Sequence, residues 1–339
     1  MINVTTPDSV RPAIRARHRF GYRGNMFMLW LGQRIPPVGY LGVAIVSFGF
    51  WLANRPARQA SMDFWTRVAG IRNRLALYWM SYRQMRTFGI LILDRSITLS
   101  RPNSGIEIES EHRDRLLSAM AMDRGVLILT AHFGALEIAA PWLKTYIHPN
   151  KMNFVMYRDL NDTTEQFHRD QWKMLQGMGF INSMDPIAAG LQIMAALRQR
   201  QCVGMRADRI MGGRTIQVSL LGSPAWLPAG PFTAAVAGDA VVVTAFTLRQ
   251  SSRRYRMFVS PPRRYDTHGG QSHEALIQQA ATDYAADLEN LLRRYPDQWG
   301  NFHHFWAAPG GIPNNSNSNA ETVTAPTQSS AVTTPPGSR

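Results

Sequence analysis

Apolar residues follow two different patterns along the chain, and the change between them falls near residue 100. Residues 35–54 form a run of 20 residues without a charged side chain, rich in Val, Ile, Phe and Leu. From about Gly105 onward, short continuous apolar runs alternate with stretches of helical periodicity. Continuous apolar runs of this kind are typical of strands buried on both faces of a sheet. The pattern predicts an α/β domain preceded by an apolar N-terminal segment.

The expected strands and helices of the α/β domain are bounded by glycine, proline and capping residues. Asp185-Pro186, for example, places a capping carboxylate and a first-turn proline before a helix. Strands are expected at residues 106–109, 126–130, 152–157, 202–206, 216–220, 240–248 and 255–260. Helices are expected at residues 111–123, 163–178, 187–200, 233–238 and 272–294, and a Pro/Gly-rich loop at 222–232. This alternation predicts a central sheet flanked by helices.

The apolar run at residues 35–54 is about as long as a helix that crosses a bilayer. Two prolines and three glycines inside it weaken a straight helix, so a bent or interfacial segment is an equal alternative to a membrane span. A secretory signal is disfavoured because no small-residue cleavage site follows the run. We expect residues 1–100 to be a membrane-associated segment, residues 101–312 the α/β domain and residues 313–339 a disordered tail.

Positive charge is concentrated beside this apolar run. The chain carries 37 Lys and Arg against 23 Asp and Glu, a net charge of +14, and its first hundred residues hold 14 arginines and three acids. Basic side chains that flank an apolar segment are attracted to an anionic membrane surface. The alternatives are a solvated helix face and, because arginines alternate with aromatic residues at 65–86, a non-catalytic protein that binds RNA or membranes.

His132 is the strongest candidate for chemistry, because it directly follows the expected strand at residues 126–130. Gly134 permits a tight turn, and Glu137 falls about one turn into the segment behind it. Open α/β sheets bind ligands at the carboxyl edge, where His132 is expected. There the Glu137 carboxylate can orient the imidazole as a general base for an alcohol. The alternative is a histidine that caps a helix beside a solvated glutamate.

Arg206, Asp208 and Arg209 lie at the end of the expected strand at residues 202–206, and so at the same sheet edge. The two arginines can bind a phosphate or a phosphopantetheine arm; the alternative is a structural ion network around Asp208. Cys202 is the only cysteine, which excludes a disulfide scaffold and a multi-thiolate metal site, and we expect it in the core. No Walker loop, Rossmann fingerprint or nucleophilic-serine motif is present.

Aromatic side chains gather again at residues 299–306, near the end of the part expected to be ordered. Such clusters pack in a core more often than they anchor a protein at a membrane interface. His303 and His304 point apart on either a helix or a strand, so they make a poor metal-binding pair. We expect a packed cluster here and no metal site.

Four blocks of sequence together resemble the bacterial lipid A late acyltransferase family, which belongs to the lysophospholipid acyltransferase superfamily and carries its His-x4-Asp/Glu motif. The blocks stand in the family's order at residues 128–137, 205–209, 221–232 and 296–306. The resemblance runs from about Arg23 to Pro309 and is closest to the predicted acyltransferases associated with aryl polyene gene clusters.

The resemblance implies a mixed central sheet flanked by helices, as in glycerol-3-phosphate acyltransferases. It implies an enzyme at the cytoplasmic face of the inner membrane that moves an acyl group from acyl carrier protein or coenzyme A to a hydroxyl of a lipid acceptor. His132 would be the base and Glu137 its orienting partner. Substrate contacts are expected at Gly134, Arg206, Asp208 and Arg209. Anionic membrane lipids are expected partners, whereas nucleic acid, cofactors and metals are not. A lysophospholipid or glycerolipid acyltransferase is the alternative within the superfamily.

Overall fold

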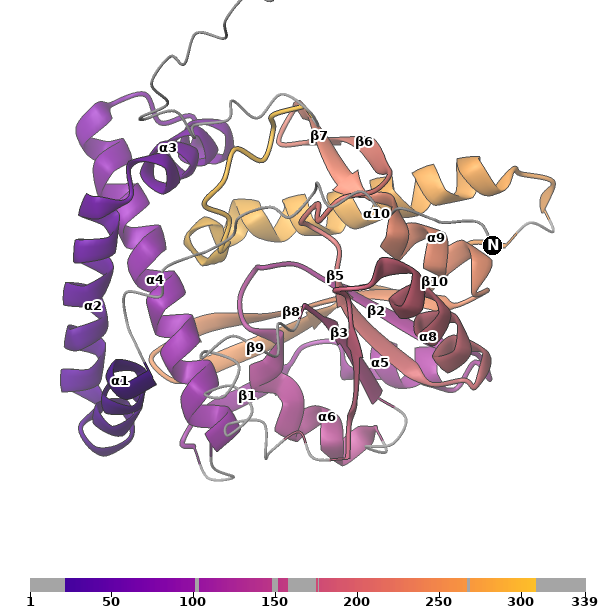
Figure 1. Ribbon diagram of the computed structural model, residues 1–339, viewed down its shortest axis with the longest axis horizontal. Coiled ribbons are helices and arrows are strands. Elements are labelled where there is room, and N and C mark those ends of the chain that lie inside the picture. The colour runs from indigo at the N-terminus through magenta and orange to yellow at the C-terminus, as the bar shows by residue number, and fades with distance from the viewer. Residues whose placement is uncertain are drawn as a thin grey trace, which may run out of the picture.

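The computed structural model describes residues 22–100, 104–147, 152–157, 175, 177–266 and 269–308. The predicted tail at residues 313–339 and most of the predicted helix at 163–178 lie outside the described residues. Within them, a mixed sheet has helices on both faces, and a group of N-terminal helices stands at one end (Figure 1). The mixed α/β fold is therefore confirmed.

The sheet has the strand order β1-β9-β8-β2-β5-β3-β4, with β10 paired to β8. Its centre is parallel, and β9 and β10 run antiparallel to β8. In the central pair, Thr130 of β2 lies opposite Arg206 of β5. The carboxyl ends of these two strands therefore bring residues 131–132 and 207–209 side by side. The strands are β1 (Glu107–Ser110), β2 (Val126–Thr130), β3 (Met152–Met156), β4 (Gly179–Asn182), β5 (Cys202–Arg206), β8 (Val241–Ser251), β9 (Arg254–Val259) and β10 (Arg263–Arg264).

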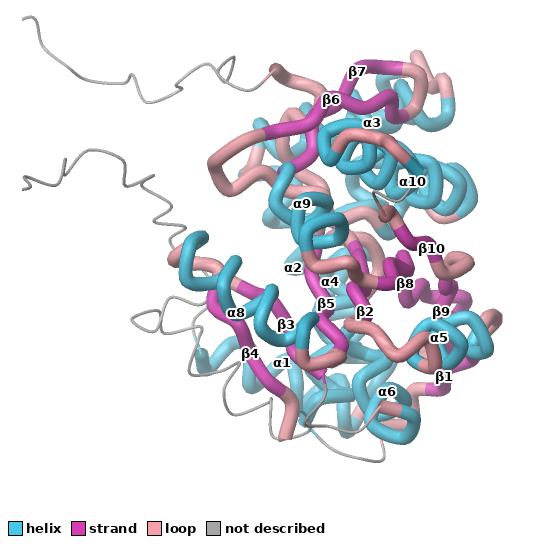
Figure 2. The backbone as a smooth tube through the Cα atoms, turned by 90° about the vertical axis from the view of Figure 1, so that its right-hand side faces the viewer, coloured by secondary structure: helices cyan, strands magenta, loops and turns pink. Residues whose placement is uncertain are grey.

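Helices cover the two faces of the sheet, and each face has its own apolar cluster. One face packs against α5 and α6, and the other against α8, α9 and α10 (Figure 2). Cys202 is buried, as predicted. The helices are α5 (Arg113–Met120), α6 (Ala140–Tyr146), α8 (Pro186–Arg198), α9 (Ala229–Ala237) and α10 (His273–Arg294). Asp185 caps α8 by accepting hydrogen bonds from two backbone amides, as its sequence indicated.

The loop predicted at residues 222–232 is wrong. Residues 223–228 instead form β7 (Ser223–Pro228), an antiparallel partner of β6 (Thr215–Leu220), and the following residues already belong to α9. Both prolines of β7 are tolerated because this two-stranded ribbon has free edges, where a missing N–H interrupts no sheet.

The N-terminal segment forms four helices, which we call the helical platform: α1 (Tyr22–Arg34), α2 (Pro36–Ala53), α3 (Arg55–Ala69) and α4 (Arg74–Ser100). The prolines at the start of α2 occupy its first turn, where a missing N–H has no cost, so they do not interrupt the helix. Gly39 is instead a contact point, because a Cβ there would lie 2.7 Å from the Cα of Gly32 in α1.

The platform and the sheet share α4. Asp94 of α4 is fully buried and accepts hydrogen bonds from Tyr40 of α2 at 2.7 Å and from Tyr255 of β9 at 2.6 Å. Burial outweighs these bonds and raises the pKa of Asp94. Gln84, also buried, bonds Ser61 and Trp65 of α3 through its oxygen and the carbonyl of Trp299 through its nitrogen. The platform is thus packed against the α/β domain as one structure.

Some aromatic side chains of the platform are packed within it. Trp65 is buried, and Tyr82 donates to the carbonyl of Ala44 at 3.2 Å while contacting Trp51 edge-on. Trp79, in contrast, is 61% exposed. The packing therefore removes Trp65 and Tyr82, but not Trp79, from a stacking surface for bases, which single-stranded nucleic acid binding requires.

The two α2 glycines at positions 39 and 49 provide a matched test of this packing. We expect Gly39→Ala to lower the free energy of unfolding by about 1–3 kcal/mol, because its Cβ meets the α1 backbone. Gly49→Ala, which meets nothing within 4 Å, should raise it by up to about 1 kcal/mol through helix propensity. Urea unfolding in detergent measures both, and equal effects of the two substitutions would contradict the packing.

Candidate active site

His132 lies two residues beyond β2, at the carboxyl edge of the sheet, as predicted. The chain turns sharply behind it at Gly134, whose φ of 66° favours glycine. A Cβ at Gly134 would stand 2.1 Å from the carbonyl oxygen of Thr247. The Gly134 N–H donates to the carbonyl of Gln298 at 3.0 Å. Gly134 thus shapes the turn, and its amide is already used internally rather than presented to a substrate.

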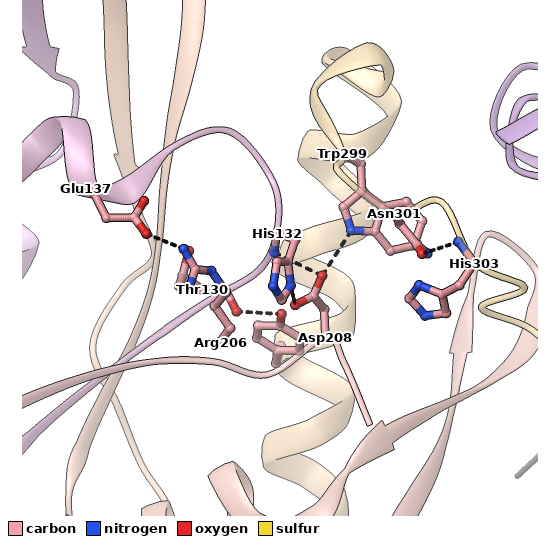
Figure 3. A network of polar contacts seen from close by, with 9 residues as sticks. Thr130, His132, Glu137, Arg206, Asp208, Trp299, Asn301 and His303 are labelled. Carbon is pink, nitrogen blue, oxygen red and sulfur yellow. Dashed lines mark hydrogen bonds and ion pairs between the residues drawn. The ribbon is translucent and has the colours of Figure 1, made fainter. Parts of the chain in front are cut away.

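The carboxylate at His132 belongs to Asp208 (Figure 3). Nδ1 of the ring lies 2.9 Å from Oδ1 of Asp208, and the backbone N–H of His132 donates to Oδ2 at 3.0 Å. These two contacts fix the ring relative to its own backbone. The side chain of His132 is 27% exposed, and no hydrogen bond to Nε2 occurs within the described residues. An imidazole held by Nδ1, with Nε2 available, is the arrangement of a general base.

Asp208 is nearly inaccessible to solvent, at 3% exposed. Besides His132, the indole Nε1 of Trp299 donates to Oδ2 at 3.2 Å. Burial favours the protonated acid, yet the His132 charge and these hydrogen bonds outweigh it and lower the pKa of Asp208 to about 2. The carboxylate therefore stays ionised at neutral pH and can stabilise an imidazolium.

The predicted pairing of His132 with Glu137 is not the one that the structure shows. Glu137 lies in the short 3₁₀ helix η1 (Leu136–Ala139), where it forms an ion pair with Arg206 and lies 3.8 Å from Arg95 of α4. In Figure 3, Glu137 is on the other side of Arg206 from His132. Burial opposes the ionisation of Glu137, but the two guanidinium groups outweigh it and lower its pKa to about 2. Glu137 is thus a fixed anion that holds Arg206.

Arg209 differs from Arg206, with which it was predicted to bind a phosphate or a phosphopantetheine arm. Arg206 is committed to Glu137, and Asp208 is committed to His132. Arg209 is partly buried, and no carboxylate of the described chain lies within ion-pair distance of it. His303 lies near Arg209 and is exposed at its outer side. Its pKa is lowered to about 4, first by partial desolvation of the ring and then by the charge of Arg209. The site edge therefore carries an uncommitted cation.

Trp299 is a site residue that the sequence indicated only as part of a packed cluster. It is fully buried, contacts Phe64 and Phe305 edge-on and forms an isolated bridge with Phe133, the residue after His132. Core packing is thus confirmed for Trp299, but its indole N–H also holds Asp208. No sequence spacing links positions 132, 208 and 299, because only the sheet order and the returning C-terminal segment bring them together.

Comparison with known protein families shows the family of the chain. The profile of the family described as bacterial lipid A biosynthesis acyltransferase matches residues 79–308, which include most of α4, the whole sheet and Trp299. The chain belongs to this family. It is therefore an acyltransferase, and the family supports a lipid A-like acceptor and an acyl donor. No individually curated protein matches the chain.

The ion pair of Glu137 predicts a pH-dependent contribution to stability. Its pKa in the folded protein, about 2, is below that of an ordinary glutamate, so this contribution is fully present above about pH 5 and is lost as the pH falls toward 2. We expect Glu137→Gln to be destabilising at pH 7 and to approach the wild type as the pH falls. Urea unfolding from pH 7 to pH 3 measures this difference.

Glu274→Gln is the matched control, because Glu274 forms an exposed ion pair with Arg214 at 2.9 Å. An exposed pair contributes little, so this substitution should change stability slightly at every pH. A wild-type advantage over Glu137→Gln that persists unchanged at pH 3 would contradict the assigned ion pair.

Proposed function

We propose that this protein transfers a fatty acyl group from an acyl thioester to a hydroxyl of a lipid A-like acceptor, with His132 as the general base and Asp208 as its orienting partner. The observation that carries the proposal is the contact of Nδ1 with the buried Asp208 carboxylate, which leaves Nε2 for a substrate. The donor is the thioester of acyl carrier protein or of coenzyme A.

The reaction needs one base and no protein nucleophile. Nε2 of His132 takes the proton of the acceptor hydroxyl as its oxygen attacks the thioester carbonyl carbon. The tetrahedral intermediate then expels the thiolate, which takes up the proton from the imidazolium. Asp208 stays ionised throughout and stabilises the imidazolium, while Trp299 and the backbone of His132 hold the carboxylate in place.

Arg209 supplies the charge that an anionic substrate requires. Both the donor, through its phosphopantetheine phosphate, and a lipid A-like acceptor carry phosphate groups, for which arginine provides paired donors. Next to Arg206, a pocket of about 20 Å³ is lined by Leu136, Phe154 and Met205 together with the Glu137–Arg206 ion pair, and it is too small for an acyl chain. We therefore place only the phosphate, on the side of Arg209.

The proposed setting is the cytoplasmic face of the inner membrane. Among the described helices, α2 alone is long and apolar enough to cross a membrane. Exposed arginines of the platform, including Arg23, Arg55 and Arg74, suit an anionic leaflet. Acyl carrier protein and coenzyme A are also anionic, so either donor would be attracted to this surface.

The base and its partner are tested with purified variants, using labelled acyl-carrier-protein and acyl-coenzyme A donors and a panel of lipid acceptors. His132→Ala should lower kcat by about 10²- to 10⁴-fold, the usual contribution of a general base. Asp208→Asn should also lower kcat, because the imidazolium that forms in the proposed reaction loses its counter-charge.

Two controls make this test specific. Glu137→Gln keeps the contact of His132 with Asp208, so it should lower kcat far less than Asp208→Asn does, whereas His273→Ala, at the exposed start of α10, should leave turnover unchanged. Near-wild-type turnover from folded His132→Ala would contradict the proposal. Selective transfer to a lysophospholipid would instead assign the glycerolipid alternative.

Arg209 is tested by its effect on KM. Arg209→Ala should raise KM for one substrate by about 10- to 100-fold, the loss expected for a charged hydrogen bond, with little change in kcat. The substrate affected shows whether Arg209 binds the donor or the acceptor. Arg254→Ala removes an exposed arginine that is already paired with Glu107 and should change neither value. Unchanged KM for both substrates in Arg209→Ala would refute the assigned role.

A further inference from the structure

An apolar stripe runs along the outer side of α2. Its members recur at intervals of three or four residues, which places them on one face of the helix. Each is between 44% and 65% exposed: Val38, Leu41, Ile45, Phe48 and Leu52. Exposed Phe27 and Trp30 of α1 and Leu75 and Trp79 of α4 carry further apolar surface on the platform. Monomeric soluble proteins seldom leave so many large apolar side chains together in water.

The opposite side of α2 is attached to α4 along most of its length. Near one end, Tyr40 donates to Asp94 at 2.7 Å, and near the other Trp51 donates to Ser81 at 2.7 Å. Between them, a Cβ at Gly89 of α4 would lie 2.8 Å from Ser47 of α2, so the helices are in close contact. Figure 1 shows α2 at the outer edge, with α4 between it and the sheet.

α4 cannot follow α2 into a bilayer. Arg83 pairs with Asp297 at 3.1 Å, Arg95 lies 3.8 Å from Glu137, and the buried Gln84 bonds Trp299. These contacts fasten α4 to the α/β domain, whose surface is charged. A spanning α2 would have to separate from α4. Asp94, which is buried, would then lose the hydrogen bond from Tyr40, and a buried acid that loses a hydrogen-bond partner is destabilising.

The charges of the platform identify what covers the stripe. Residues 22–100 contain ten arginines and two acids. Of the acids, Asp63 pairs with Arg67 at 3.1 Å and Asp94 is buried, so the exposed charge is positive. An apolar face bordered by exposed arginines matches the acyl chains and headgroups of an anionic phospholipid leaflet.

We propose that α1 and α2 lie in the plane of a single leaflet, with the α2 stripe in the acyl region, and that α2 does not cross the membrane. The inference rests on the membrane association in the proposed function. It places α4 between the lipid and the catalytic groups. Because a helix is only about 10 Å thick, the acceptor headgroup can reach His132 while its chains stay in the leaflet.

Depth measurements distinguish the two orientations. Val38, Ile45 and Leu52 are spaced by seven residues and so lie on one face of α2. Single cysteines at these positions therefore carry nitroxide labels that point in the same direction. The buried Cys202 remains unlabelled. Full-length protein is bound to vesicles of phosphatidylethanolamine and phosphatidylglycerol. An in-plane helix gives three equal depths, whereas a spanning helix places the label at position 45 about 10 Å deeper than the other two.

Equal, shallow depths support the proposal, and a label at position 45 that lies about 10 Å deeper overturns it. A label at Ile187 of α8, an equally apolar position that is 79% exposed, should remain in water in either case. If the folded protein fails to bind the vesicles, the membrane association assumed in the proposed function is itself wrong. This outcome is therefore distinct from the one in which the protein binds but α2 spans the bilayer.

A charge in the stripe gives a second measurement. Ile45→Glu should reduce partitioning into the same vesicles at least about tenfold. The substitution removes an apolar side chain that the leaflet would bury, and its negative charge is repelled by the anionic lipid surface. Ile187→Glu adds the same charge outside the platform and should change partitioning less than twofold. Equal losses in the two variants would show that net charge, rather than the α2 stripe, governs binding.

Discussion

The carboxylate of Asp208 holds the candidate site together. It is buried at 3% exposure and receives hydrogen bonds from the backbone and ring of His132 and from the Trp299 indole. A buried anion is costly unless it is paired and hydrogen-bonded, so these partners are required for its burial. Asp208 follows β5, and its partners come from the end of β2 and from the segment after α10. The candidate base is therefore positioned only when the sheet and the C-terminal segment have packed around this carboxylate.

The helical platform also supports the candidate site, through contacts of α4 with Trp299 and with Glu137. Gln84 of α4 bonds the Trp299 carbonyl at 2.7 Å, while Arg95 of α4 lies near the Glu137–Arg206 pair. The catalytic arrangement and the apolar outer surface thus share one helix. A segment that reads in sequence as a membrane tether is, in the folded protein, part of the support of the site.

Sequence patterns predicted the strands of the sheet better than they predicted which side chains contact one another in the candidate site. The bounds of β2 and β5 match the apolar runs at residues 126–130 and 202–206, because strands buried on both faces leave continuous apolar sequence. His132 was predicted at the correct edge for the same reason. The partner of His132 was not, because sequence spacing says nothing of strand order. The four platform helices were also missed as separate elements, since their boundaries depend on packing between them.

The two buried carboxylates, Glu137 and Asp208, have different roles in the candidate site because their partners differ. Glu137 faces Arg206 and Arg95, which stay protonated, so its charge is fixed and it can only hold cations in place. Asp208 faces an imidazole, whose charge would change in the proposed proton transfer, so its attraction for the ring would change with that reaction. In the spacing of four residues between His132 and Glu137, the turn at Gly134 and the ion pair with Arg206 separate the two side chains. Among the described charged groups of this edge, the three arginines at positions 95, 206 and 209 then outnumber the carboxylates of Glu137 and Asp208. The excess of one positive charge suits the proposed reaction, in which a phosphate would bind and an oxyanion would form.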